Sequence, residues 1–432
     1  MISRREFLEA ASSTAVAGAL ASGNERQGTQ QNPQQNPQQT DRKRVAIITT
    51  VWRYLSHAQH MGDRFLLGYP HEGRWHRPAI DVVSLYVDQQ PTGDQSGSRA
   101  REFGFKAFPS IAEALRLGGS ALAVDAVLVI GEHGNYPRNE KGQILYPRHE
   151  FFQQVVNVFR EDKRAVPVFN DKHLSYSFGQ AEQMVAASKE LGFPLMAGSS
   201  LPVTWRLPSI ELPHEAPVED ALMVGVGSSD AMDFHALEAM QCMLERRRGG
   251  ETGVKAVQLV EGDAVWTAGE RGRWSVDLLE AALSRSNQLQ GVSRSESKPQ
   301  DLVRNGLLKQ LAANPAAYFV EYTDGLRATL LMLNGAVGDF TFAARLAGRE
   351  DLLSTLFYLP PTPNVTNSAE LMNRVEGMFL TGQTPYPVQR TLLVSGVLES
   401  CLESRAAGNR RLETPNLGVS YRVDAESRFA TT

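Results

Sequence analysis

The sequence predicts a two-domain α/β protein, in which a Rossmann-like, doubly wound parallel sheet precedes an α+β domain with a largely antiparallel sheet. Three observations predict this fold class. From residue 45 to residue 197, short apolar segments alternate with segments of helical spacing, which is the pattern of βαβ units. After Pro208 and Pro213 the strand-like segments follow one another closely, which favours antiparallel pairing. The chain also has 432 residues, more than one hydrophobic core usually organises.

Composition and charge narrow the classes of function. The chain carries 44 Lys and Arg residues against 48 Asp and Glu, so it lacks the basic surface of a general nucleic-acid binder. Two cysteines are too few for a disulfide framework or a cysteine-based zinc site. No segment approaches the roughly 18–20 consecutive apolar residues of a membrane span. We therefore expect neither nucleic acid as a partner nor a stable membrane span.

The N-terminal residues are predicted to form an export signal and a linker. Ser3-Arg4-Arg5-Glu6-Phe7-Leu8, followed by small and apolar residues up to Ala21, resembles a twin-arginine export signal. We expect residues 1–21 to be a signal peptide that engages the twin-arginine export machinery, with a periplasmic or extracellular destination. Residues 22–41 are rich in Gln, Asn and Pro, and are predicted to form a disordered linker because they have little to bury.

The first domain is predicted over residues 42–205. Its strands are short and mainly apolar, as expected for strands buried on both faces of a parallel sheet. Segments with helical spacing lie between them. The predicted strands are 45–49, 80–87, 124–130, 165–169 and 194–197, and the predicted helices are 111–117, 150–160 and 180–191.

The second domain is predicted over residues 206–410, followed by a polar C-terminal tail over 411–432. Its last three strands follow one another so closely that they predict an antiparallel meander. Residues 291–300 are polar and are predicted to form a loop. The predicted strands are 219–227, 254–260, 319–322, 326–332 and 340–344, and the predicted helices are 233–248 and 388–404.

Several segments resemble a known family. Phe108-Pro-Ser-Ile-Ala-Glu-Ala-Leu115, followed by Val124-Asp-Ala-Val-Leu-Val-Ile130, is similar to a helix–strand motif of the glucose–fructose oxidoreductase/inositol dehydrogenase (Gfo/Idh/MocA) family. Pro167-Val-Phe-Asn-Asp-Lys172-His-Leu-Ser175 stands where the family has its Glu-Lys-Pro motif, and Pro194-Leu-Met-Ala-Gly198 resembles the strand that follows it. Glu321-Tyr-Thr-Asp-Gly325 fits the second domain. The resemblance spans residues 44–410 and rests on the order of weak motifs.

The resemblance implies an exported oxidoreductase that transfers a hydride between NAD or NADP and a sugar or polyol. It also implies a homo-oligomer built on an exposed face of the second-domain sheet. Ligands of parallel sheets bind at the carboxyl ends of the strands, where polar residues follow the predicted strands here. The expected cofactor-binding residues are Thr49, Thr50, Asp88, Gly131, Glu132 and His133.

The turn after the first strand departs from the family's pattern. Family members have G-x-G-x-x-G there, whose glycines let the pyrophosphate approach the backbone and a helix N-terminus. The corresponding segment here, Ile48-Thr-Thr-Val-Trp-Arg-Tyr54, has no glycine and places Trp52 and Arg53 in the turn. Asp88, by contrast, stands where an acid would bind the ribose hydroxyls. The two features leave NAD(P) binding open.

The catalytic candidates are Lys172, His173, Asp233 and His235. Lys172 takes the place of the family's lysine, where it would polarise a substrate hydroxyl or relay its proton. His235 resembles the histidine of the family's Asp-x-x-x-His pair, although Asp233 stands two residues before it. The alternative interpretations are a solvent-facing lysine and an aspartate that caps a helix.

Histidines near the predicted strand ends suggest a second kind of site. Two histidines with one or two carboxylates are enough to bind zinc, iron or manganese, although loop histidines also make purely local hydrogen bonds. The candidates for a divalent metal are His57, His60, His133 and Asp171. A metal- or His-dependent carbohydrate lyase or hydrolase without NAD(P), or a non-catalytic carbohydrate-binding relative, is therefore the alternative to the oxidoreductase.

Overall fold

The computed structural model describes residues 42–227, 230–291, 299–360, 363–426 and 429–431. The predicted signal peptide (1–21) and the whole of the predicted linker (22–41) lie outside the described residues, as does most of the loop predicted over 291–300. No helix in the described part of the chain is long and apolar enough to cross a membrane.

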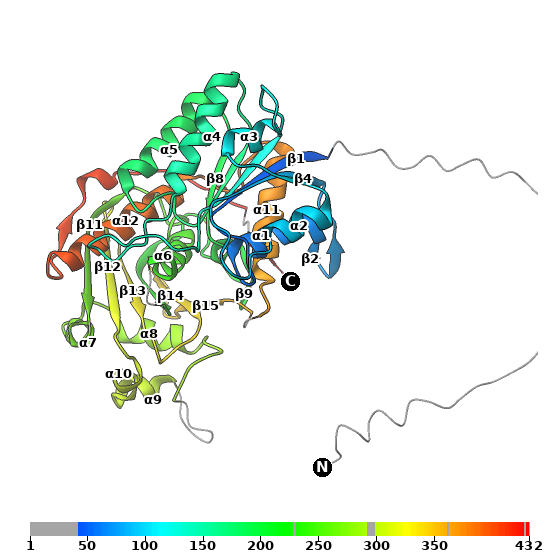
Figure 1. Ribbon diagram of the computed structural model, residues 1–432. Coiled ribbons are helices and arrows are strands. Elements are labelled where there is room, and N and C mark those ends of the chain that lie inside the picture. Colours follow the sequence, from blue (N-terminus) through cyan, green and yellow to red (C-terminus); the bar gives the residue numbers. More distant parts are fainter. Residues whose placement is uncertain (1–41, 228–229, 292–298, 361–362, 427–428, 432) are drawn as a thin grey trace, which may run out of the picture. The chain divides into compact units, whose positions relative to one another are not determined.

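The first sheet has six parallel strands in the order β5-β4-β1-β6-β7-β8 (Figure 1). The chain starts in the middle of the sheet, builds one side through β4 and β5, and then builds the other side from β6 to β8. This doubly wound order confirms the predicted Rossmann-like sheet. The strands are β1 (Lys43–Thr49), β4 (Ile80–Val87), β5 (Lys106–Ala107), β6 (Ala126–Ile130), β7 (Val168–Asp171) and β8 (Leu195–Gly198).

Helices cover both faces of this sheet, which explains why its central strands consist mainly of apolar residues. On one face Ala46 and Ile48 belong to the same hydrophobic core as residues of α3, α4 and α5. On the other face Val45 and Ile47 pack in a core with residues of α1 and α11, and α2 lies at its margin. The helices are α1 (His57–Leu67), α2 (Ser96–Phe103), α3 (Ile111–Arg116), α4 (Arg148–Asp162), α5 (Phe178–Leu191) and α11 (Asn367–Thr381).

One of these covering helices comes from far along the chain. Figure 1 shows α11, in orange, beside α1, in blue, and the two helices are in contact. Helix α11 also contacts a hairpin of β2 (Tyr69–His71) and β3 (Arg74–His76), which is inserted between α1 and β4. A segment of the predicted second domain therefore completes the core of the first sheet.

The second sheet has eight strands in the order β16-β11-β12-β13-β10-β14-β15-β9. All neighbours are antiparallel except β10 and β13, so the sheet is largely antiparallel as predicted. The predicted meander is wrong in one respect: β12 and β13 pair as expected, but β10 lies between β13 and β14. The strands are β9 (Arg206–Leu207), β10 (Val218–Gly225), β11 (Val254–Glu261), β12 (Ala316–Tyr322), β13 (Arg327–Met332), β14 (Phe340–Leu346), β15 (Leu353–Phe357) and β16 (Leu412–Glu413).

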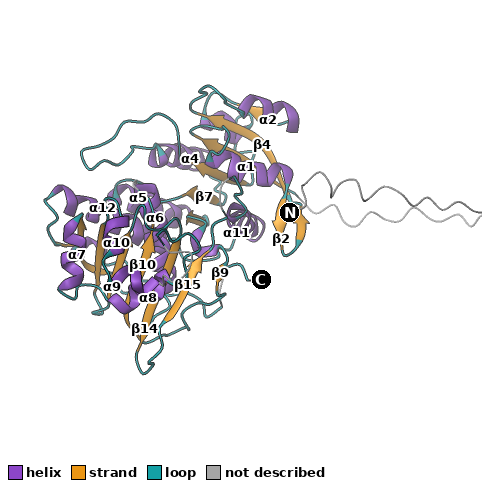
Figure 2. Ribbon diagram, turned by 90° about the horizontal axis from the view of Figure 1, so that it is seen from below, coloured by secondary structure: helices purple, strands orange, loops and turns teal. Residues whose placement is uncertain are grey.

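Both faces of the second sheet are covered. Alternate residues of β10 face opposite cores: Met223 packs toward α6 and α12, whereas Leu222 and Val224 pack toward α7, α8, α9 and α10. Figure 2 shows α8, α9 and α10 against the strands of this sheet. The face expected to be open for a homo-oligomer is thus buried under these helices. Their bounds are α6 (Asp230–Leu244), α7 (Asp263–Glu270), α8 (Val276–Leu283), α9 (Pro299–Arg304), α10 (Leu307–Leu311) and α12 (Gln389–Ala406).

Two short 3-10 helices, η1 (Leu201–Val203) and η2 (Pro415–Leu417), complete the described elements of regular structure. The predicted polar tail does not project from the fold. Strand β16 pairs with β11, and the backbone of Tyr421 exchanges hydrogen bonds with that of Glu251. The C-terminal residues therefore belong to the packed body.

Candidate active site

Two of the predicted catalytic residues meet at the carboxyl edge of the first sheet. Lys172 directly follows β7, and His235 lies in the first turns of α6. The Nζ of Lys172 donates a hydrogen bond to Nε2 of His235. Lys172 has a left-handed backbone conformation with φ of 65°, and its N–H donates to the carbonyl oxygen of Gly198 at 3.1 Å. Such a conformation in a residue other than glycine is concentrated at functional sites.

Burial sets the charges of this pair. Lys172 is only 3% exposed, and burial lowers the pKa of its ammonium group. Burial, and then the charge of Lys172, hold the pKa of His235 well below its ordinary value. His235 is therefore neutral near pH 7, so its Nε2 accepts from Lys172 while its Nδ1 carries the ring proton. The Nδ1 atom has no hydrogen-bond partner among the described residues.

A second pair lies beside the first. Nδ1 of His57, at the start of α1, lies 2.6 Å from Oδ2 of Asp171. Burial, followed by the charge of Lys172, lowers the pKa of His57 to about 3, and burial raises the pKa of Asp171 to about 6. At neutral pH the carboxylate of Asp171 accepts the Nδ1 proton of a neutral His57. This contact orients the ring and fixes the tautomer in which Nε2 carries no proton.

The other two metal candidates extend this cluster without forming a metal site. The ring centroid of His57 lies 5.8 Å from that of His60 and 5.0 Å from that of His133. Burial and the neighbouring His57 lower the pKa of His60 to about 3 and that of His133 to about 4. Nowhere in the described ranges do three or more His, Cys, Asp or Glu side chains form a group that could hold a metal ion. The rings pack against one another instead.

A buried arginine organises Glu132 and His173. The guanidinium of Arg148, at the start of α4, pairs with the carboxylate of Glu132 and donates to Nε2 of His173 at 3.2 Å. Its side chain also packs on Gly131, where an added Cβ would lie 2.6 Å from Cγ of Arg148. Burial and then Arg148 hold the pKa of His173 well below its ordinary value, so His173 is neutral. Lys172, which precedes His173 in the chain, thus lies next to the buried contacts of Arg148 as well as to His235.

The two pairs line a small cavity of about 60 Å³. Liquid water occupies about 30 Å³ per molecule, so this space fits one reacting group of a substrate rather than a whole sugar. Six lining residues were not predicted as site residues, and four of these are polar: Ser199 and Ser200 follow β8, where the strand-end rule points, but Asn367 and Ser368 belong to α11 and no sequence pattern marks them. The lining residues are His57, His60, Met61, Asp171, Lys172, Ser199, Ser200, His235, Asn367, Ser368 and Leu371.

Asp233 lies away from this cavity. Its Oδ2 accepts a hydrogen bond from the hydroxyl of Tyr318 at 2.6 Å, and burial raises its pKa to about 6. The structure therefore brings Lys172, His235 and, through Arg148, His173 together, but places Asp233 against the second sheet.

The hydroxyl groups of the predicted cofactor residues at the end of β1, Thr49 and Thr50, are occupied by hydrogen bonds within the protein. Thr49 Oγ1 donates to the carbonyl oxygens of Val51 and Ile130, and Thr50 Oγ1 donates to that of Glu132. Both threonines are fully buried. They tie β1 to β6 at the point where the strand order reverses, which is where doubly wound sheets bind their ligands.

The turn between β1 and α1 is filled by its own side chains. Trp52 is fully buried and packs against Gly62 of α1. The contact is so close that a Cβ added at Gly62 would lie 2.6 Å from Cη2 of Trp52. The hydroxyl of Ser56 accepts from the N–H groups of Arg53 and Gln59, at 3.0 and 3.4 Å. The Oε1 atom of Gln59 accepts from the N–H of Leu55. The N–H groups that hold a pyrophosphate in a Rossmann fold are largely occupied here.

At the end of β4, Asp88 remains exposed. Its two carboxylate oxygens accept hydrogen bonds from the hydroxyls of Tyr86 and Tyr136, at 3.0 and 2.6 Å. The position fits the ribose-binding acid of the family, whereas the filled β1–α1 turn does not fit a pyrophosphate at the N-terminus of α1. The residues present thus do not fit a dinucleotide bound in the usual Rossmann manner.

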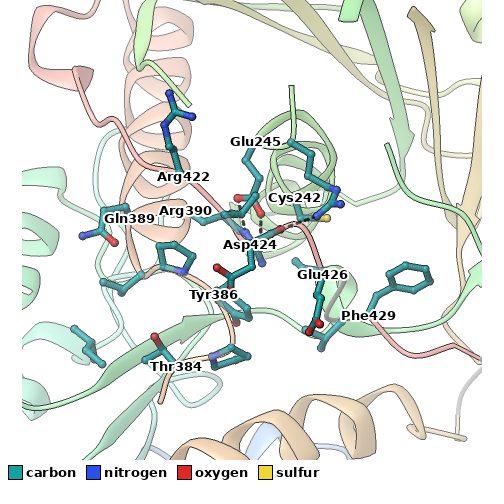
Figure 3. Close-up of a pocket in the computed structure, with 18 of the residues that line it drawn as sticks. Cys242, Glu245, Thr384, Tyr386, Gln389, Arg390, Arg422, Asp424, Glu426 and Phe429 are labelled. Atoms are coloured by element: carbon teal, nitrogen blue, oxygen red, sulfur yellow. Dashed lines mark hydrogen bonds and ion pairs between the residues drawn. The ribbon is translucent and has the colours of Figure 1, made fainter. Parts of the chain in front are cut away.

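A larger cavity of about 430 Å³ lies elsewhere, between α5, α6 and the C-terminal residues (Figure 3). Figure 3 shows Arg390 and Glu245 directed at one another, with Nε of Arg390 at 2.8 Å from Oε2 of Glu245. Arg206 similarly pairs with Glu211 at 3.2 Å. None of the candidate catalytic residues lines this cavity. Because Arg390 and Arg206 are already paired with Glu245 and Glu211, their charges do not indicate which ligand would bind in this cavity.

No protein-family model matches the sequence, and no curated protein matches it. Several solved structures match its fold. GenD2 from gentamicin A biosynthesis, in complex with NAD, has a TM-score of 0.52 and 15% identity, and the match covers 90% of this chain and 99% of that one. Apo scyllo-inositol dehydrogenase from Lactobacillus casei has a TM-score of 0.50 and 9% identity, over 86% of this chain and 98% of that one. A probable dehydrogenase from Thermotoga maritima has a TM-score of 0.51 and 12% identity, over 87% and 99%.

The chain therefore has the two-domain fold of the Gfo/Idh/MocA-type dehydrogenases, which confirms the fold that the sequence resemblance implied. The match extends over both sheets, since it covers nearly the whole length of each neighbour.

Proposed function

We propose that the protein is an oxidoreductase that acts on a hydroxyl-bearing carbon of a sugar or polyol, with NAD or NADP as its hydride partner. The observation that carries the proposal is the buried contact between Lys172 and His235 at the carboxyl edge of a doubly wound sheet. The fold supports the same class, because GenD2 binds NAD and other neighbours are inositol dehydrogenases.

The residues of this chain would handle the proton of the reaction. Oxidation of an alcohol removes a hydride from carbon and a proton from oxygen. Lys172, whose pKa burial lowers, is suited to exchange that proton with the substrate oxygen, and neutral His235 accepts a hydrogen bond from Nζ and so positions it. The cavity of about 60 Å³ has room for the reacting hydroxyl, so the remainder of the substrate must enter by displacing lining side chains.

The position of the cofactor would differ from that in a Rossmann domain with a glycine-rich turn. Because the β1–α1 turn is filled, the pyrophosphate would have to lie away from the N-terminus of α1. Asp88 would still offer a carboxylate to a ribose diol.

The same turn favours a second candidate function, a His- and Lys-dependent carbohydrate lyase or hydrolase without a nucleotide. In that case the Asp171–His57 pair would remove a proton and Lys172 would donate one to the leaving oxygen. The elimination needs no redox partner, since the proton and the leaving group depart from the same substrate.

One experiment separates the two candidates. The mature protein is purified natively and denatured, and the released nicotinamide nucleotide and metals are measured. Nucleotide near one equivalent per chain supports the oxidoreductase. Absence of nucleotide, together with no change in melting temperature when NAD or NADP is added, contradicts it; polyols or oligosaccharides that then change mass without any nucleotide support the lyase or hydrolase.

We also propose that the protein is exported by the twin-arginine route. The support is the sequence Ser3-Arg4-Arg5-Glu6-Phe7-Leu8. In a bacterial host with the twin-arginine machinery, the full chain should reach the periplasm, and Arg4→Lys/Arg5→Lys should hold it in the cytoplasm. Equal periplasmic fractions for both chains would contradict this route.

A further inference from the structure

A second cavity, of about 550 Å³, lies on another side of α11 from the catalytic cluster. It is enclosed by the β2–β3 hairpin, α11, Trp205 after η1 and the C-terminal residues. Figure 2 shows β2, α11 and the C-terminal end in the same region, and α11 contacts both β2 and η1. The lining residues are Pro70, His71, Glu72, Gly73, Trp205, Thr366, Glu370, Arg374, Phe429, Ala430 and Thr431.

Helix α11 separates this cavity from the reaction centre. Thr366, Glu370 and Arg374 are four residues apart and form one stripe along the helix, and this stripe lines the larger cavity. Asn367 and Leu371 form the adjacent stripe and line the catalytic cavity. The two cavities are thus neighbours on one rigid element.

The hairpin is fixed to α11 by another glutamate. Glu376 accepts from the hydroxyl of Tyr69 at 2.6 Å and from the N–H of Ala79 at 2.9 Å, and it lies 2.8 Å from Nε2 of His76. These contacts hold His71 over the cavity. The wall is therefore built before any ligand arrives, which lowers the entropic cost of binding.

Glu370 is a buried polar group that lacks one hydrogen bond. Its side chain is 2% exposed, and its Oε1 lies 3.4 Å from Nδ1 of His71. Its Oε2 is buried and has no hydrogen-bond partner in the described part of the chain. A buried carboxylate oxygen without a donor is costly, and a ligand hydroxyl would supply the missing hydrogen bond.

The surrounding groups limit the kind of ligand. Arg374 beside Glu370 disfavours a cation, and Glu370 disfavours an anion. Trp205 and His71 offer flat faces for the apolar face of a ring, and the volume lies in the range of ligand pockets, about 300–1,000 Å³. A neutral ring with several hydroxyl groups satisfies all of these conditions.

We propose that this cavity is a binding site for a neutral polyol or sugar ring, with Glu370 accepting hydroxyl protons and Trp205 stacking on the ring. It is distinct from the Lys172–His235 centre. The site binds without chemistry, so it stands or falls independently of the proposed oxidoreductase.

Tryptophan fluorescence titrated with myo-inositol, glucose and maltose tests the site. At least one probe should bind, and Glu370→Gln should weaken it about tenfold, as expected for the loss of one charge-assisted hydrogen bond. Trp205→Leu should abolish the fluorescence change. Melting curves verify that the variants are folded.

Two further variants locate the binding. Trp75→Phe replaces a tryptophan that is 58% exposed on the same hairpin and does not line the cavity, so the titration should be unchanged. Lys172→Met should also bind the probe as well as the wild type does. The proposal is overturned if no probe binds at concentrations up to 100-fold above a typical dissociation constant of about 1 mM. It is also overturned if Glu370→Gln binds the probe as tightly as the wild type does, or if Lys172→Met removes binding.

Discussion

The β1–α1 turn and the contact between β7 and α6 lie at the same carboxyl edge of the first sheet, but they differ in what the sequence has kept. At the β7–α6 contact, Lys172 and His235 meet as the family resemblance implies. At the β1–α1 turn, Trp52 and the Ser56–Gln59 hydrogen bonds occupy the place of a glycine loop. The same sheet edge thus combines a buried Lys172–His235 contact with a turn in which the chain's own side chains occupy the place of a phosphate-binding loop.

The largest expected effect is on kcat, at the contact between Lys172 and His235. Lys172→Met should lower kcat on the turned-over polyol about 10³-fold, because it removes a positioned acid/base group. Steady-state kinetics measure the loss, with Lys106→Met, an exposed lysine of β5, as the matched control. Equal rates for the wild type and Lys172→Met would remove the pair from the mechanism.

The next largest effect is at the filled turn. Trp52→Ala should lower the free energy of unfolding by about 3 kcal/mol, since it empties a fully buried site. Gly62→Ala should cost about 1–3 kcal/mol in the wild type, because its Cβ would collide with the Trp52 ring.

In Trp52→Ala, however, Gly62→Ala should cost almost nothing. Urea unfolding of the four chains measures this coupling. Additive losses would mean that Trp52 does not fill the turn as described.

The Asp171–His57 pair connects the two regions and should show a smaller effect on activity. Asp171→Asn should lower kcat about 10²-fold, because the amide no longer fixes the tautomer of His57. Burial raises the pKa of Asp171 to about 6, so wild-type activity should fall as pH drops below 6 and the carboxylate is protonated. The variant should lack this acid limb, whereas exposed Asp81→Asn should keep it. An unchanged limb in Asp171→Asn would assign it to another group.

The smallest effect concerns stability. Burial lowers the pKa of five histidines, so the unfolded chain binds their protons below pH 6.5 while the folded chain does not. Stability should therefore rise with pH between about 4 and 6.5. Seven carboxyls with raised pKa values act in the opposite direction: Asp63, Asp171, Asp220, Asp230, Asp233, Glu238 and Asp339. We expect the histidines to dominate between pH 5 and pH 7, because their ordinary pKa of 6.5 lies inside that range whereas the ordinary pKa of a carboxyl lies below it.

Calorimetry at pH 5 and pH 7 should thus give the lower melting temperature at pH 5. His57→Asn should reduce the difference. A higher melting temperature at pH 5 would show that the carboxyls dominate.

Much of the fold could be predicted from local patterns. The strand predicted over 80–87 matches β4, and the helix predicted over 111–117 nearly matches α3. Runs without polar residues identify strands buried on both faces, because nothing else requires such runs in short segments. Strand-end placement and the family resemblance marked Lys172 and His235 as separate candidates, and the contact between them is a finding of the structure.

The rest depends on long-range packing. Helix α11 covers the first sheet although it lies about 320 residues after β1, and α8 to α10 bury the face that we expected to be open. Strand β10 lies between β13 and β14, and the short spacing between strands along the sequence does not determine such a non-consecutive order. Arg148 was missed because a buried cation at a helix start has the same local pattern as a surface residue.

The central claim is that Lys172 and His235 form the proton-handling centre of a polyol oxidoreductase. The most direct measurement incubates the native protein with NAD or NADP and polyols that carry deuterium on the carbinol carbon, and follows the label by mass spectrometry. We predict that deuterium reaches the nicotinamide with the wild type and not with Lys172→Met. No transfer with any polyol, or equal transfer by the variant, would contradict the account.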